Sequence, residues 1–498
     1  MARHVEIERK YETDHEFTLP DLRDVPGLSS VAPPVRHSLL ARYHDTEDLR
    51  LARHGITLRR RTGGDDDGWH LKLPKTGDER HEIGRPAGDP ADGVPAELAD
   101  LVLARTRGGP LIPVAELRTD RTEYALLADD GSVLGKLADD RVSGLRLGRL
   151  GEGVTSWREL EVELVAGPPD LLANVGDQLI DYGARSSDAP AKLAVVLGDD
   201  AVPAEPPART RTAAEVMTGY LRAQADRMLS YDPLVRLADH DDDSVHKMRT
   251  SIRRIRSVLR THRRLLDRGR TDVLDSELKW LAGVLGEVRD LEVLQARFRD
   301  QLSRFPAPPA QPGWLSELAI QEGLARDRVR DRLRSARYMA LLDRVDTMLA
   351  DPPVTDRAHR SAREQQRKIV ARARRKMIRK YKAAEALPEG PDRDAALHGT
   401  RKAAKRLRYT AKAAEPVLGK PARRISRRAK KLQDVLGAHQ DRIVASEHLS
   451  RVENARADSP ADGYTLGLLI AVQEGADTLE DLPGTWKKAA DGKLAKKL

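Results

Sequence analysis

The first charged side chains of the sequence recur at every second position. Glu6, Glu8 and Lys10 follow this spacing, and Val5 and Ile7 fall between them. Side chains alternate between the two faces of a β-strand, so a strand here would place two carboxylates and an ammonium on one face. This combination suits a divalent metal beside a polyanion. One such strand alone is more typical of an ordinary solvent-exposed sheet face, so the interpretation depends on whether other strands repeat it.

Later segments repeat the period. Charged residues two apart occur at Arg59 and Arg61, His70 and Lys72, Glu116 and Arg118, and Glu159, Glu161 and Glu163. If the sheet closes, its interior would gather these carboxylates and cations: Glu6, Glu8, Glu159, Glu161 and Glu163, and Lys10, Arg59, Arg61, Lys72 and Arg118. Grouped carboxylates are costly unless a cation such as Mg²⁺ or Mn²⁺ joins them, and clustered cations suit phosphate oxygens. The pattern therefore favours a metal-dependent polyphosphate site over a sheet with exchangeable surface ion pairs.

The segments that carry these residues are predicted to be short antiparallel strands. Gly and Asp clusters at 63–68 and 129–131 are typical of hairpin turns between such strands. Residues 168–182 and 189–197 are predicted to be helices. Many short antiparallel strands favour a closed or near-closed barrel, which would allow the charged faces to line its interior.

The composition limits the class of protein. The 498 residues include no cysteine, which excludes disulfides, thiolate metal sites and cysteine catalysis. The N-terminus has no apolar signal segment and no run approaches the ~20 apolar residues of a membrane span, so we expect a cytoplasmic protein. Residues 1–200 carry a net charge of −11 and residues 201–498 a net charge of +20. This asymmetry predicts two domains, of which the basic one should attract nucleic acid, polyphosphate or an anionic membrane surface.

The basic part of the sequence is predicted to be all helical and to contain an internal repeat. It follows a Pro- and Ala-rich segment, 199–211, that we interpret as a linker. VHKMRTSIRRIRSVL from Val245 matches LHGTRKAAKRLRYTA from Leu397, so that His246 aligns with His398 at an offset of 152. VLGEVRD at 284–290 matches VLGAHQD at 435–441, at an offset of 151. Two such halves should pack as a pseudo-symmetric helical bundle.

Each repeat carries a basic stripe at helical spacing. The stripes comprise His246, Arg249, Arg253, Arg256, Arg260 and Arg263, and His398, Arg401, Lys405, Arg408 and Lys412. Like charges four apart weaken an isolated helix, so two matching stripes favour a polyanion ligand over a merely solvated face. Nucleic acid is not favoured, because only Tyr409 adds an aromatic stacking platform to the stripes. The two histidines lack a carboxylate or histidine four residues later, which favours polyanion contact or structural hydrogen bonding over metal binding.

Residues 4–197 resemble the CYTH domain, also called the triphosphate tunnel metalloenzyme fold. The resemblance rests on Glu6-x-Glu8-x-Lys10, RYHDTEDLRLARHGITLRRRT, GWHLKLP, ELEVEL and APAKL. It implies an eight-stranded antiparallel tunnel in a family that hydrolyses inorganic triphosphate, thiamine triphosphate or RNA 5′-triphosphates, or cyclises ATP. It also implies metal-site carboxylates and phosphate-binding cations: Glu6, Glu8, Glu161 and Glu163, and Lys10, Arg59, Arg61, Lys72, Arg118 and Lys192.

Residues 212–482 resemble the CHAD domain, the conserved histidine α-helical domain. The resemblance rests on VHKMRTSIRRIRSVL, LHGTRKAAKRLRYTAK and the two Leu-Gly…Asp segments at 285–290 and 436–441. It implies two four-helix bundles with a basic surface that binds inorganic polyphosphate. That surface would be lined by His246, Arg249, Arg253, Arg256, His398, Arg401, Lys405 and Arg408.

Together these observations predict an α+β protein with four segments: a tunnel domain (1–198), a linker (199–211), a helical domain (212–483) and a basic tail (484–498). The predicted activity is Mg²⁺- or Mn²⁺-dependent hydrolysis of inorganic triphosphate or a related short triphosphate. Water would attack a terminal phosphorus while catalytic cations stabilise the developing charge: Lys10, Arg59, Arg61 and Lys72. The alternatives are a non-catalytic polyphosphate-binding or targeting protein, an adenylate cyclase and a thiamine triphosphatase. We expect triphosphate and polyphosphate as partners, with no membrane and no obligate protein partner.

Overall fold

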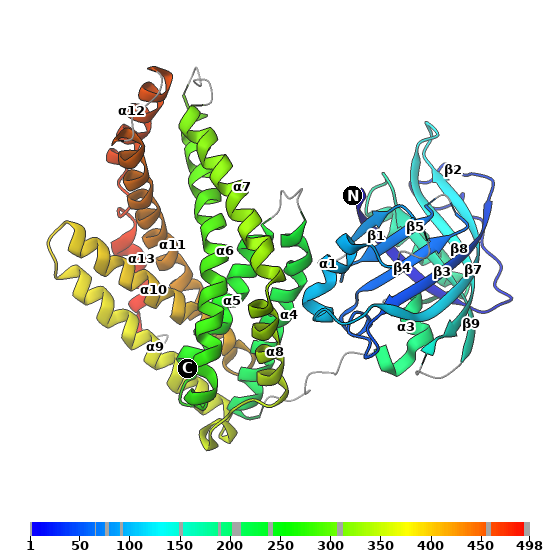
Figure 1. Ribbon diagram of the computed structural model, residues 1–498, viewed down its shortest axis with the longest axis horizontal. Helices are drawn as coiled ribbons and strands as arrows, with labels where there is room; N and C mark the ends of the chain where they lie inside the picture. Colours follow the sequence, from blue (N-terminus) through cyan, green and yellow to red (C-terminus); the bar gives the residue numbers. More distant parts are fainter. Residues whose placement is uncertain are drawn as a thin grey trace. The chain divides into compact units, whose positions relative to one another are not determined.

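The chain divides into two compact units, Met1–Glu205 and Pro206–Leu498. The division falls within the predicted linker, of which residues 202–210 lie outside the described part. The computed structural model (Figure 1) describes residues 2–64, 66–74, 79–89, 93–148, 153–187, 191–201, 211–237, 243–305, 312–454 and 460–492.

The first unit is an antiparallel sheet that closes on itself. The strands run in the order β1-β6-β5-β4-β3-β7-β8-β9, and β9 pairs again with β1. The predicted α+β class and closed sheet are confirmed. The sheet has ten strands rather than eight, because two two-residue strands, β2 and β10, pair with β7 and β1. The bounds are β1 Ala2–Thr13, β2 Ser30–Val31, β3 Val35–Asp45, β4 Thr57–Thr62, β5 Gly68–Lys72, β6 Glu79–Arg85, β7 Ile112–Leu127, β8 Val133–Arg146, β9 Val154–Leu164 and β10 Arg185–Ser186.

Apolar side chains on the outer face of the sheet pack against short helices. Leu160 and Val162 of β9 lie in one core with Leu171 and Val175 of α2. Alternation then turns the charged residues between them, at 159, 161 and 163, toward the interior of the sheet. The short helices of this unit are α1 Ala96–Thr106, α2 Asp170–Asp181, α3 Lys192–Leu197, and the 3₁₀ turns Ala52–His54 and Gly198–Ala201.

In its described residues the second unit is helical and shows the repeat as two series of five helices, α4–α8 and α9–α13. A turn of 3₁₀ helix, Asp356–His359, precedes the second series. The series are α4 Ala213–Arg236, α5 Ser244–Thr261, α6 Arg268–Leu302, α7 Gly313–Arg334 and α8 Ala336–Ala350, and α9 Ala362–Glu385, α10 Pro391–Ala413, α11 Glu415–Asn454, α12 Pro460–Glu474 and α13 Leu482–Ala490.

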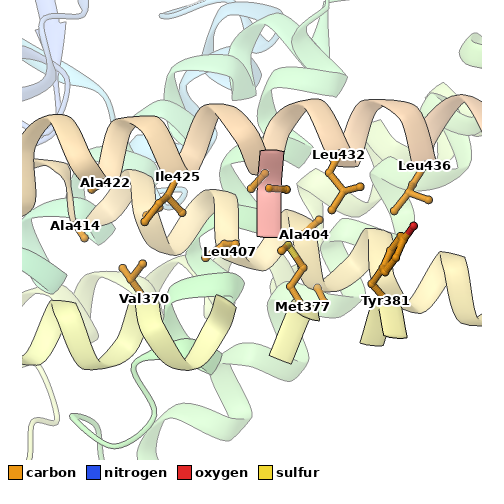
Figure 2. Close-up of a cluster of buried hydrophobic side chains, with 14 of the residues drawn as sticks. Val370, Met377, Tyr381, Ala404, Leu407, Ala414, Ala422, Ile425, Leu432 and Leu436 are labelled. Carbon is orange, nitrogen blue, oxygen red and sulfur yellow. The ribbon is translucent and has the colours of Figure 1, made fainter. Parts of the chain in front are cut away.

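Two buried cores each join four helices of this unit. One joins α9, α10, α11 and α13, with Met377, Leu407 and Leu432 at its centre (Figure 2). The other joins α6 and α7 to α11 and α12, through residues such as Phe298 and Leu469. Because the second core draws helices from both repeats, the two halves share part of their hydrophobic interior.

The predicted basic tail is wrong for residues 484–490, which belong to helix α13. Leu482 and Ala489 are buried in the core with α9, α10 and α11. Trp486 stacks on Tyr381, with 3.7 Å between ring centroids. These apolar residues outweigh the neighbouring lysines and fix the helix against the bundle. Residues 493–498 lie outside the described part.

Among the residues described, no helix is both long and apolar enough to cross a lipid bilayer.

Candidate active site

A cavity of about 240 Å³ lies inside the closed sheet. Strands β1, β3, β4, β5, β6, β7, β8 and β9 each contribute side chains to its lining, together with the start of α3. Eight of the predicted site residues line it: Glu8, Lys10, Arg59, Arg61, Lys72, Glu161, Glu163 and Lys192.

Glu161 is held by three cations. Its Oε1 lies 2.5 Å from Lys10 Nζ and 2.8 Å from Lys192 Nζ, and its Oε2 accepts a 2.7 Å hydrogen bond from Arg121. Strand register explains the first contact, because Lys10 of β1 lies directly opposite Glu161 of β9. Lys192 reaches the same carboxylate from the first position of α3.

The same cations bind a second pair of carboxylates. Lys192 Nζ lies 2.9 Å from Asp140 Oδ2 and 2.6 Å from Glu159 Oε1. Arg121 donates to both Asp140 oxygens, at 2.8 and 2.7 Å. Asp140 is fully buried, so its charge depends on these partners.

This network fixes the charge states. Burial raises the pKa of Glu161, but Lys10, Lys192 and Arg121 outweigh it and hold that pKa well below the usual range. Burial lowers the pKa of Lys192, but Asp140, Glu161 and Glu159 raise it above the usual value. Both groups therefore stay ionised at neutral pH.

The arginines of β4 are less completely neutralised. Burial, and then Arg59 and Arg121, lower the pKa of Arg61 to about 10. Arg59 donates a 3.3 Å hydrogen bond to the Tyr43 hydroxyl, and Arg61 pairs with Asp66. This side of the cavity carries positive charge that a phosphate could balance.

In the second unit the two basic stripes meet. Burial, and then Arg253, Arg401 and Arg249, lower the pKa of Lys405 to about 7. Two of these arginines lie on α5 and one lies with Lys405 on α10. Arg253 also donates a 3.1 Å hydrogen bond to the Tyr409 hydroxyl of α10. The cluster of Arg249, Arg253, Arg401 and Lys405 is called the central basic cluster below.

The remaining stripe residues lie around this cluster. Arg256 turns to Asp275, with Nε 3.0 Å from Oδ1, and Arg408 donates a 3.3 Å hydrogen bond to Gln433. Burial lowers the pKa of His246 and of His398, and neighbouring cations lower both further. Both imidazoles are therefore neutral at pH 7.

Comparison with known proteins assigns both units. The CYTH domain model matches residues 4–188, and the CHAD domain model matches residues 219–450. Two uncharacterized proteins of Mycobacterium tuberculosis, MT2285 and Rv2226, are each 37% identical over 504 residues, covering 96% of this chain and 94% of theirs. The chain belongs to the family of proteins with a CYTH domain followed by a CHAD domain. The crystal structure of the CHAD domain from the plant Ricinus communis is 25% identical, with a TM-score of 0.45, and covers 57% of this chain and 95% of its own.

CYTH domains act on triphosphates as hydrolases or cyclases, so membership supports a triphosphate-related enzymatic function for the first unit. The order of the two domains is the one predicted from the sequence. Their names are used for the two units from here on.

Arg118, which was predicted to bind phosphate, lies on the outer face of the sheet and does not line the cavity. The Arg118 side chain is 79% exposed and lies 3.7 Å from Glu116 on the outer face of β7. The inward positions of β7 are the odd ones, and they include Arg121 and Glu123. Both faces of this strand carry charge, so alternation alone does not identify the face that points into the cavity. The charge pattern therefore predicted Arg118 in place of Arg121.

Two of the predicted metal carboxylates, Glu6 and Glu159, are not among the described residues that line the cavity. The Glu6 side chain lies outside the described residues, although the backbone of Glu6 pairs with Arg80 in β6. Glu159 is buried beside the cavity rather than lining it, and accepts a 2.6 Å hydrogen bond from Trp157 Nε1.

Sequence reasoning missed Arg121, Asp140 and Glu82. Glu82 lies 2.5 Å from His70 Nδ1 and 3.1 Å from Lys72 Nζ. Its strand, β6, was not predicted because it contains a single large apolar residue, Ile83. A weak alternation of charge was the only signal in that segment.

The carboxylates that line the cavity, and those buried beside it, fit a hard divalent cation. Oxygens of Asp140, Glu159 and Glu161 lie within 4.8 Å of one another. Glu8 and Glu163 face each other across β1 and β9, one inward position along from Glu161. All five donors are carboxylates, which Mg²⁺ and Mn²⁺ prefer. Glu161 belongs to both groups and so is the residue most central to any bound metal.

A repeated glycine contact supports the central basic cluster of the CHAD domain. A Cβ on Gly286 of α6 would lie 3.2 Å from Arg249 Nη2, and a Cβ on Gly437 of α11 would lie 3.5 Å from Arg401 Nε. In both repeats, therefore, an arginine of the basic stripe lies against a helical glycine. At Gly286 the absent Cβ leaves space for the Arg249 guanidinium, whereas a Cβ at Gly437 would make an ordinary van der Waals contact with Arg401.

Replacing Lys192 with methionine tests the ion network. The change leaves buried carboxylates without their main cation, so we expect the free energy of unfolding of the CYTH domain to fall by about 3 to 5 kcal/mol. Mn²⁺ should restore thermal stability in Lys192→Met more than in the unsubstituted protein, because the carboxylates can take up the ion instead. Thermal unfolding followed by circular dichroism measures both effects.

Lys136→Met is the matched control. Lys136 lines the same cavity but is 44% exposed and pairs only with Glu123, so its loss should cost less than about 1 kcal/mol. Equal stability of Lys192→Met and the unsubstituted protein would contradict the network described above.

Proposed function

We propose that the CYTH domain is a metal-dependent hydrolase of inorganic triphosphate or a related short triphosphate. The observation that carries this proposal is the division of one cavity into a carboxylate side, centred on Glu161, and a cation side, formed by Arg59, Arg61 and Lys72. Such a cavity complements a ligand that carries both phosphate oxygens and a metal ion. Apolar lining is sparse, which favours a ligand made mainly of phosphate over one with a large base.

The chemistry would depend on placement of charge rather than on a covalent nucleophile. Arg59, Arg61 and Lys72 would bind the phosphate oxygens and stabilise the charge that develops on them in the transition state. Lys10 and Lys192 would hold Glu161 ionised and oriented. Glu8, Glu161 and Glu163 would hold a divalent cation, which would supply neutralising charge for the phosphates and a more acidic water.

We propose further that the CHAD domain binds inorganic polyphosphate on the central basic cluster. The support is the grouping of Arg249, Arg253 and Arg401 around Lys405, whose pKa is lowered first by its burial and then by these arginines. A chain of phosphates supplies repeated negative charge at short spacing. Binding would therefore relieve the repulsion that the folded domain maintains.

Arginines on opposite faces of β7 test the hydrolase. Arg121→Ala should lower the rate of phosphate release from inorganic triphosphate by about 10² to 10³, because Glu161 and Asp140 lose the guanidinium that holds them in a preorganised site. Arg118→Ala removes the same side chain from the outer face and should leave the rate near that of the unsubstituted protein. Steady-state phosphate release with Mg²⁺ or Mn²⁺ measures the rates, and circular dichroism confirms that both variants fold. Similar rates for the two variants would contradict the proposed site.

Glycines one turn apart on α6 test the central basic cluster. Gly286→Ala should displace Arg249 and weaken polyphosphate binding about tenfold, the effect of one charge-assisted contact. Gly283→Ala is the control, because a Cβ there meets nothing within 4 Å. Equilibrium binding of long-chain polyphosphate to the full chain gives the two affinities. A loss in both variants, or in neither, would rule out the positioning role of Gly286.

The pH dependence of polyphosphate binding tests Lys405. Its pKa is about 7 in the free protein, and a bound polyanion would raise it, so binding takes up a proton above pH 7. Affinity should fall about fivefold between pH 7 and pH 8, where the two stripe histidines are already neutral. Lys405→Arg keeps its charge over this range and should abolish the decline. A decline of the same size in Lys405→Arg would assign it to another group.

A further inference from the structure

A hollow of about 440 Å³ in the CHAD domain lies apart from the central basic cluster. It is formed by the end of α5, the start of α6 and the facing sides of α9 and α10. Arg249, in the central basic cluster, and Arg260, in the hollow, are eleven residues apart on α5, which is about 16 Å along a helix axis. None of the four cluster residues lines the hollow.

The rim of the hollow holds seven cationic side chains and two carboxylates, Asp272 and Asp275. Asp275 is already bound by Arg256 and Arg260, at 3.0 and 2.7 Å. Asp272 lies 3.8 Å from Arg268. Across the described part of the chain, no carboxylate lies within 4 Å of the other five cations: Arg263, Arg264, Arg372, Lys376 and Arg406.

The burial and unbalanced charge of the rim lower the pKa values of some of its cationic side chains. Burial lowers the pKa of Arg406, and Arg260 and Arg256 lower it further. Burial likewise lowers the pKa of Lys376, and the positive charge of Arg406 lowers it further. In the CYTH cavity, by contrast, Lys10, Lys192 and Arg121 all have carboxylate partners. The hollow is therefore short of negative charge that a ligand could supply.

Its floor is apolar. Leu259 and Ala403 are buried there, and Ile369 and Ala373 of α9 complete the floor. A long inorganic polyphosphate chain has no group that would cover these side chains. A ligand with an apolar body and several phosphates would use both parts of the hollow.

We propose that this hollow is a second anion site of the CHAD domain, and that it binds a compact organic polyphosphate of the nucleoside polyphosphate class. The phosphates would contact the rim, chiefly Arg372, Lys376 and Arg406, and the apolar part of the ligand would cover Leu259 and Ile369. The volume is within the range of small-molecule sites. The site does not depend on the proposed hydrolase activity of the CYTH domain.

Binding of ATP by the full-length chain tests this site. The measurement is titration calorimetry in the presence of EDTA, in an Arg59→Ala/Arg61→Ala/Arg249→Ala/Arg401→Ala background that weakens binding in the CYTH cavity and at the central basic cluster. We expect one ATP site that the triple variant Arg372→Ala/Lys376→Ala/Arg406→Ala weakens at least about tenfold, because it removes three charge-assisted contacts. Inorganic triphosphate should bind the same site more weakly than ATP, because it leaves the floor uncovered.

A control variant makes the test specific. Arg423→Ala/Arg424→Ala/Arg427→Ala removes three exposed arginines of α11 that belong neither to the hollow nor to the central basic cluster, and it should leave ATP affinity unchanged. Equal losses in the α11 and hollow variants would show general charge attraction and overturn the proposal. It would also be overturned if the hollow variant kept full affinity, or if inorganic triphosphate bound as tightly as ATP.

Discussion

The CYTH domain depends on the pairing of buried opposite charges around Glu161. A closed sheet that turns charged faces inward must compensate each charge, since an ionised group transferred from water to a protein interior without a partner costs several kcal/mol. Lys10, Lys192 and Arg121 supply that compensation from β1, α3 and β7. Elements distant in the sequence are thus joined by one carboxylate. The same arrangement keeps acids and bases ionised and close together, as a site for metal and phosphate requires.

In the CHAD domain, by contrast, the positive charges are not fully balanced by carboxylates. Its basic side chains outnumber the carboxylates near them, both around Lys405 and around the hollow beside α9. Such an excess opposes folding, and the buried cores that join the helices must offset it. A domain that maintains unbalanced positive charge is suited to binding anions reversibly. A domain that balances its charge internally is suited to holding a reacting group in place.

Much of the site was predictable because β-strand alternation is strict. Glu8, Lys10, Arg59, Arg61 and Lys72 were identified from spacing alone, and the structure places all five around one cavity. The same rule failed on β7, where charges occupy both faces.

Two other elements escaped prediction for different reasons. Strand β6 carries little apolar signal, so Glu82 could not be assigned to a strand. Helix α13 was readable in principle, because Leu482, Trp486 and Ala489 follow a helical period, but the lysines beside them suggested a solvated tail. The pairing of Lys192 with Asp140 could not be predicted from the sequence, because it depends on how α3 packs against the closed sheet.

Phosphate release from a panel of substrates by the unsubstituted protein tests the central claim most directly. The panel comprises inorganic triphosphate, ATP, thiamine triphosphate and long-chain polyphosphate, each with Mg²⁺, with Mn²⁺ and with EDTA. The charge arrangement around Glu161 predicts metal-dependent release that is fastest from inorganic triphosphate. Release from inorganic triphosphate no faster than in EDTA would show that the cavity holds charge without performing hydrolysis.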